Sequence, residues 1–75
     1  MNTIGTESPK PLFIVHEDLE GGYIARCPQF SIYTQGDTWE ELIVNIKEAI
    51  LCHFDDAKAP TSFTLHTVKR EEMAL

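Results

Sequence analysis

The stretch Gly36-Asp37-Thr38-Trp39-Glu40-Glu41-Leu42 decides the fold, because it begins the only long helix that the sequence predicts. Thr38 and Glu41 have capping-box spacing: the threonine hydroxyl can accept from the Glu41 amide, and the Glu41 carboxylate can reach back to the Thr38 amide. Acidic residues on both sides of Thr38 place negative charge at the positive end of the helix dipole. The predicted helix opens in this stretch and runs to about Phe54.

The predicted helix has one apolar face and one polar face. A stripe at spacings of three and four is expected to pack in the core, and it consists of Trp39, Leu42, Ile43, Ile46, Ala49, Ile50 and His53. Val44 and Leu51 fall together on the opposite side, among charged residues. Such a pair is either an ordinary exposed feature or a contact site. The candidate partner-binding residues are therefore Glu40, Val44, Glu48, Leu51 and Asp55.

Four segments have the composition and alternation of strands, at residues 11–17, 22–27, 31–35 and 61–68. Gly21-Gly22 predicts a tight turn between the first two, and Pro28 ends the second. Short links between the first three strands predict an antiparallel meander, and a right-handed crossover through the helix returns the fourth strand parallel to the first. The expected class is α+β, a βββαβ arrangement with sheet order 3-2-1-4.

The first strand carries bulky apolar residues on both faces: Leu12 and Ile14 with His16 on one side, and Phe13 and Val15 on the other. One helix can cover a single face, so the second face is expected to remain a bare apolar patch unless it meets another molecule.

The chain has 75 residues, which predicts one domain, residues 1–75, with a tail at 1–10, a folded core at 11–68 and a C-terminal stub at 69–75. A core this small makes self-association, as a dimer or higher, a reasonable expectation. No apolar run spans a bilayer and no signal-peptide pattern is present, so we expect a cytoplasmic protein.

The net charge of −6 argues against direct nucleic-acid binding, because phosphate contacts need clustered lysine and arginine. It suits a basic protein partner, or it serves solubility alone. Cys27 and Cys52 are expected to be reduced thiols, and no metal, cofactor or catalytic residues are predicted.

No enzyme signature is found. The Gly21-Gly22 pair is isolated, the serines lack the glycines of a nucleophile elbow, and the carboxylates fall in turns and on the helix exterior. A metal-dependent nuclease needs acidic residues that converge at strand ends, and the acids here fall elsewhere. Only an analogy of fold would therefore support nuclease activity.

An ordered set of motifs carries a family resemblance: Gly21-Gly22-Tyr23, Cys27-Pro28, Thr34-Gln35-Gly36-Asp37-Thr38, and Asn45 followed by Glu48-Ala49-Ile50. With them the chain resembles the HicB family of antitoxins, closely over residues 11–54 and loosely over 63–68. The resemblance implies a partial RNase H-like fold without catalytic carboxylates. It also implies a partner, HicA, a small basic toxin that cleaves mRNA, whose RNA-binding face an acidic surface would cover.

Two departures from the HicB pattern matter. Many members continue into a DNA-binding domain for which this sequence has no room, so DNA-binding autoregulation is not expected. The usual Pro-Gly-Cys-like turn is replaced here by Pro28-Gln29-Phe30. The leading hypothesis is a non-enzymatic, HicB-like antitoxin with a HicA-like partner. The alternative is a stand-alone oligomeric structural or regulatory module of the same fold without a toxin.

Overall fold

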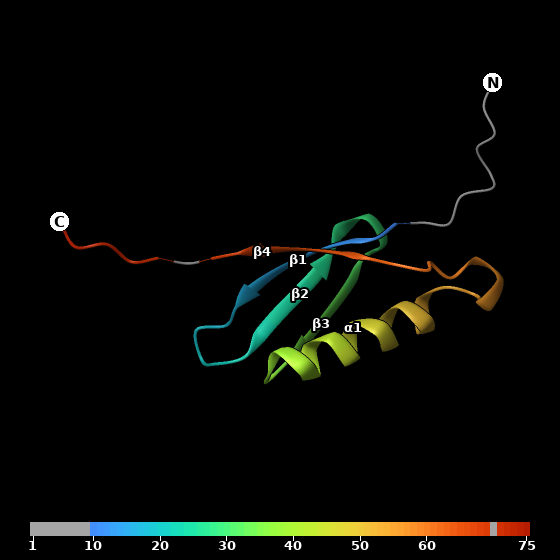
Figure 1. Ribbon diagram of the computed structural model, residues 1–75, viewed down its shortest axis with the longest axis horizontal. Helices are drawn as coiled ribbons and strands as arrows, with labels where there is room; N and C mark the ends of the chain where they lie inside the picture. The colour runs from blue at the N-terminus through green and yellow to red at the C-terminus, as the bar shows by residue number, and fades with distance from the viewer. Residues whose placement is uncertain (1–9, 70) are drawn as a thin grey trace, which may run out of the picture.

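The computed structural model describes residues 10–69 and 71–75, which form one mixed sheet and one α-helix (Figure 1). The elements are β1 (Leu12–Glu17), β2 (Tyr23–Cys27), the 3-10 turn η2 (Pro28–Phe30), β3 (Ile32–Gly36), α1 (Trp39–His53), the 3-10 turn η3 (Asp56–Lys58) and β4 (Thr64–Val68). Of the tail predicted at residues 1–10, all but Lys10 lies outside the described residues.

The strand order is β3-β2-β1-β4, with the first three strands antiparallel and β4 parallel to β1. The predicted α+β class, the βββαβ sequence of elements and the 3-2-1-4 order are therefore confirmed. The turn between β1 and β2 closes as expected, since Gly21 and Gly22 have φ values of 103° and 84° and the Asp18 amide donates to the Gly22 carbonyl at 3.0 Å.

One face of the sheet packs against α1, which contacts chiefly β3 and, less extensively, β2. The strand residues on this face alternate with outward-facing ones, as a half-covered sheet requires. The buried core consists of Phe13, Val15, Ala25, Cys27, Ile32, Leu42, Ile46 and Ile50. Phe63 closes the β4 end of this core by meeting Phe13 edge-to-face, with ring centroids 6.1 Å apart.

The start of α1 follows the predicted cap with one correction. The Glu41 amide donates to Thr38 Oγ1 at 3.0 Å, as expected. The Glu41 carboxylate accepts from the amide of Asp37 at 2.6 Å, one residue earlier than the Thr38 amide that the capping box predicts. Asp37 directly follows β3, so this hydrogen bond ties the first turn of α1 to the end of that strand.

The close packing of α1 on β3 requires a glycine at position 36. Gly36 is buried, and a Cβ there would lie 2.5 Å from the Leu42 nitrogen and 2.7 Å from its Cα. The helix backbone thus approaches the strand more closely than a side chain would allow.

The two ends of the helix stripe differ from expectation, because Trp39 is 37% exposed and His53 is exposed as well. A fifteen-residue helix is about 22 Å long, whereas a five-residue strand spans about 17 Å, so α1 is longer than the strand on which it chiefly packs. Each end instead packs on an aromatic ring: Trp39 lies edge-on to Tyr23 at 5.4 Å, and His53 lies edge-on to Phe54 at 4.8 Å.

Within the described ranges, no helix combines the length and the apolar character that crossing a membrane requires.

Candidate functional site

The most distinctive surface of the molecule is the side of α1 that faces away from the sheet. We call it the contact face; it comprises the exposed residues Glu40, Val44, Glu48, Leu51 and Asp55. The two apolar members are well exposed, Val44 at 52% and Leu51 at 64%. Helical spacing places the first four members in a row about 16 Å long. The structure thus brings together the residues that helical periodicity selects.

Asp55 differs from the other members because α1 ends at His53. It lies in the link to η3, where its backbone is extended, so its placement comes from that link and not from the helix. The sequence-based set is therefore a row on α1 with one residue beyond its end.

Negative charge dominates the contact face. Glu40, Glu48 and Asp55 are all exposed, and Lys47 is a neighbouring cation in the sequence of α1. Each exposed charge interacts weakly by itself, because water screens it. Several charges of one sign nevertheless raise the rate at which an oppositely charged protein approaches. The arrangement, apolar side chains set among carboxylates, suits a protein surface that has both apolar and basic groups.

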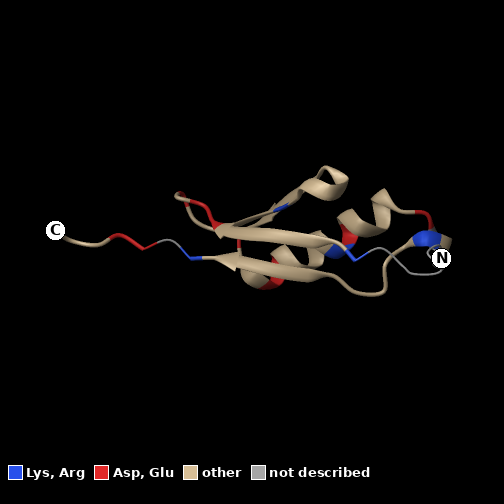
Figure 2. Ribbon diagram, turned by 90° about the horizontal axis from the view of Figure 1, so that it is seen from above, with Lys and Arg blue, Asp and Glu red and all other residues tan. Residues whose placement is uncertain are grey.

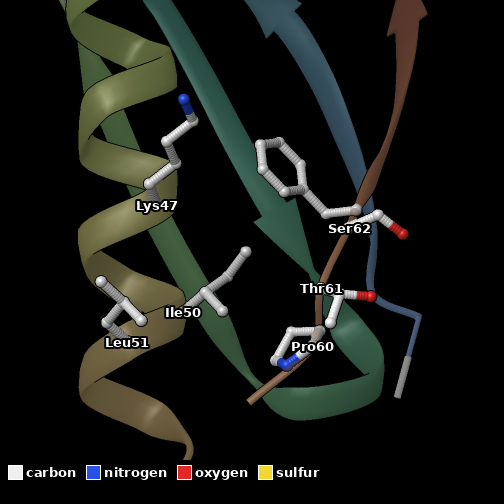
Figure 3. Close-up of a pocket in the computed structure, with 7 residues that line it drawn as sticks. Lys47, Ile50, Leu51, Pro60, Thr61 and Ser62 are labelled. Carbon is white, nitrogen blue, oxygen red and sulfur yellow. The ribbon is translucent and has the colours of Figure 1, made fainter. Parts of the chain in front are cut away.

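An open groove of about 260 Å³ adjoins the contact face at Leu51 (Figure 3). The α1 side chains Lys47, Ile50 and Leu51 form one wall, and residues 60–63, before β4, form the other. Sequence reasoning missed this groove because its walls come from segments about ten residues apart that only the crossover brings together. The sequence signal that could have indicated this groove is the presence of two apolar residues, Pro60 and Phe63, near the start of the predicted fourth strand.

The back face of the sheet, opposite α1, carries apolar side chains that no described residue covers. Leu12 and Val68 are 40% and 44% exposed, and Ile14 and Ile24 are partly exposed. The strand register places Ile14 beside Arg26 and His66, so polar side chains interrupt the apolar patch. The bare second face that the first strand predicted is therefore present.

The described residues offer few other candidate sites. A second hollow lies at the β1–β2 turn and the end of β4, lined by His16, Glu17, Asp18, Leu19 and Val68. Among residues 10–69 and 71–75, no three His, Cys, Asp or Glu side chains are grouped so that they could hold a metal ion. Cys27 is buried and Cys52 is exposed, and neither forms a disulfide.

Together these features define a small α+β protein in which a mixed βββαβ sheet carries one helix with an exposed acidic and apolar side. Three relatives, each called a UPF0150 protein, are similar to it. The one from Thermotoga maritima is 56% identical over 45 residues, which cover 60% of this chain and 64% of the relative. The one from Archaeoglobus fulgidus is 41% identical over 49 residues, 65% of this chain and 73% of the relative.

The relative from Synechocystis is 44% identical over 50 residues, 60% of this chain and 63% of its own length. The chain belongs to the UPF0150 family. It spans somewhat less than two thirds of the Thermotoga and Synechocystis relatives. No family model matches the chain, and no solved structure does.

Proposed function

We propose that this protein is a non-enzymatic, HicB-like antitoxin that binds and neutralises a small basic HicA-type toxin in the cytoplasm. The contact face would cover the RNA-binding surface of the toxin and so prevent cleavage of mRNA. The observation that carries the proposal is the exposure of Val44 and Leu51 at 52% and 64% on a helix side that also bears Glu40 and Glu48. The family resemblance and the net charge of −6 support it.

The energetics of such an interface divide between the two kinds of side chain. Burial of Val44 and Leu51 against a partner would supply the specific stabilisation, about 1.5–3 kcal/mol for each fully buried side chain. The carboxylates would steer a basic partner and exclude acidic ones. This division predicts that charge changes act mainly on the association rate, whereas apolar changes act mainly on dissociation.

Binding to a HicA-like protein encoded beside this gene tests the proposal. Calorimetry with purified proteins should show that a Val44→Ser/Leu51→Ser double variant binds at least about tenfold more weakly, which corresponds to about 1.4 kcal/mol. Leu19→Ser is the matched control, since Leu19 is 77% exposed but lies in the β1–β2 turn. The proposal is wrong if the wild-type protein neither binds nor inhibits such a neighbour. If Leu19→Ser weakens binding as much as the double variant does, the contact face is not the binding surface.

A charge experiment separates the two roles. Glu48→Lys should slow association and reduce its dependence on salt, whereas Glu20→Lys in the β1–β2 turn should change both less. Stopped-flow measurements at two ionic strengths give both quantities.

A second candidate function is a stand-alone oligomeric structural or regulatory module without a toxin. The uncovered back face of the sheet, with Leu12 and Val68 at 40% and 44% exposure, favours it. Sedimentation that shows a strict monomer would count against this candidate.

A further inference from the structure

β4 is an edge of the sheet whose outward backbone groups lack a partner among the described residues. The Thr64 amide donates to the Pro11 carbonyl at 2.9 Å, so the backbone of Thr64 is directed toward β1. Backbone groups alternate in direction along a strand, and His66 and Val68 therefore also face β1. The N–H and C=O groups of Leu65 and Thr67 consequently point to the open side.

This edge lacks the features that normally prevent strands from pairing with other molecules. Exposed edges in natural proteins usually carry a charge, a proline or a bulge. The five residues of β4, Thr64-Leu65-His66-Thr67-Val68, include no Asp, Glu, Lys, Arg, Pro or Gly. Figure 2 shows the β4 arrow without red or blue along its length. An edge of this composition is suited to pairing with another strand.

We propose that two copies of this chain pair through β4, antiparallel about a twofold axis at His66, so that their two sheets become one continuous sheet. In this register Thr64 lies opposite Val68 of the second copy, Leu65 opposite Thr67, and His66 opposite His66. All five residues of each strand are paired, and the open N–H and C=O groups of Leu65 and Thr67 are satisfied. Each side chain also lies opposite one on the same face of the sheet, as the pleat requires.

Charge favours a second copy as the occupant of this edge. Two chains of net charge −6 repel each other, so their association is most favourable through a surface that brings no carboxylates together. β4 is such a surface, since none of its residues is charged. A basic peptide strand, by contrast, would find no acid on β4 to recognise. The carboxylates of the contact face are on α1, which packs chiefly on the other edge strand, β3.

This pairing is independent of toxin binding, because it uses β4 and not the contact face. Disulfide trapping of the full chain tests the register. The exposed Cys52 is first removed by Cys52→Ser, while Cys27 is buried and remains. Side chains that face each other in such a pair have Cβ atoms about 4.5–5.5 Å apart, close to the separation in a disulfide.

In this background, His66→Cys should form a disulfide-linked dimer upon oxidation, as seen by non-reducing electrophoresis and mass spectrometry. Gln35→Cys is the matched control, since Gln35 is an exposed residue on the other edge strand, β3, and should remain monomeric under the same conditions. Equal cross-linking of the two variants, or cross-linking of Gln35→Cys alone, would overturn the proposal.

Sedimentation provides a second, non-covalent test. The wild-type chain should be a dimer, and His66→Glu should weaken the dimer by at least about tenfold, because two carboxylates would then face each other across the axis. His66 is exposed, so circular dichroism should show an unchanged fold. A wild-type monomer, or a dimer that is indifferent to His66→Glu, contradicts pairing through β4 at this register.

Discussion

The two edges of the sheet are built in opposite ways. At the β3 edge, α1 packs along the strand, Gly36 allows the Leu42 backbone to approach, and the Asn45 amide donates to the Gln35 carbonyl at 2.7 Å. At the β4 edge, four of the five residues are exposed, and the open backbone groups have no partner among the described residues. Among the described residues, α1 therefore covers part of the β3 edge, and no element pairs with the outward backbone of β4.

The contrast follows from the width of the one helix that packs on the sheet. One helix covers about two strands, since a helix with its side chains is about 10–12 Å in diameter and neighbouring strands are about 4.8 Å apart. The crossover starts at β3, so α1 covers β3 and β2 and does not reach β4. Neither edge strand carries a charged residue, since β3 reads Ile-Tyr-Thr-Gln-Gly and β4 reads Thr-Leu-His-Thr-Val. The two edges therefore differ in how far α1 covers them and not in charge.

The largest effect is expected where the closed edge is tightest. Gly36→Ala should lower the free energy of unfolding by about 3 kcal/mol, because the new Cβ would meet the backbone of Leu42. Urea unfolding measures the loss. Gly21→Ala is the control: Gly21 has a φ of 103° but nothing within 4 Å of the added Cβ, so only backbone strain of about 1 kcal/mol is expected. Equal losses would mean that the approach of α1 to β3 is not close.

Proline substitution distinguishes the two sides of β4. His66→Pro should cost about 2 kcal/mol, because it removes an amide that faces β1. Thr67→Pro removes an amide on the open side and should cost under about 1 kcal/mol in dilute protein. It should nevertheless abolish self-association. Unfolding and sedimentation of both variants check this, and similar unfolding losses would show that the open edge is misassigned.

The smallest effect concerns the hydrogen bond between α1 and β3. Asn45→Asp keeps the shape of the side chain but removes the donor that meets the Gln35 carbonyl, and a loss of about 1 kcal/mol is expected. Asn45→Ala should lose less, since the higher helix propensity of alanine offsets part of the lost bond. Thermal unfolding of the two variants measures the difference. An Asn45→Asp variant as stable as the wild type would mean that this bond does not help to close the β3 edge.

Local patterns were sufficient to predict most of the fold. The strand order, the parallel return of β4 and the Thr38 cap follow from turn residues, periodicity and the handedness of crossovers. The contact face followed from periodicity as well, since helical spacing alone places Val44 and Leu51 together. The predictions that were wrong concern features that depend on tertiary structure. The exposure of Trp39 and His53 depends on how the length of a helix compares with that of the strands beneath it, and the reach of Glu41 to Asp37 depends on the path of the chain between β3 and α1.

The sequence by itself determined the elements, their order and the side of α1 that faces outward, because these depend on neighbours within a few residues. Only the tertiary structure decided which edge of the sheet is closed, where the groove beside Ile50 lies, and that Gly36 must lack a side chain. These features depend on the distance between segments far apart in the chain. The stretch from Gly36 to Leu42 shows both kinds of feature. Its residues predict the start of the helix, whereas its packing against β3 is known only from the tertiary structure.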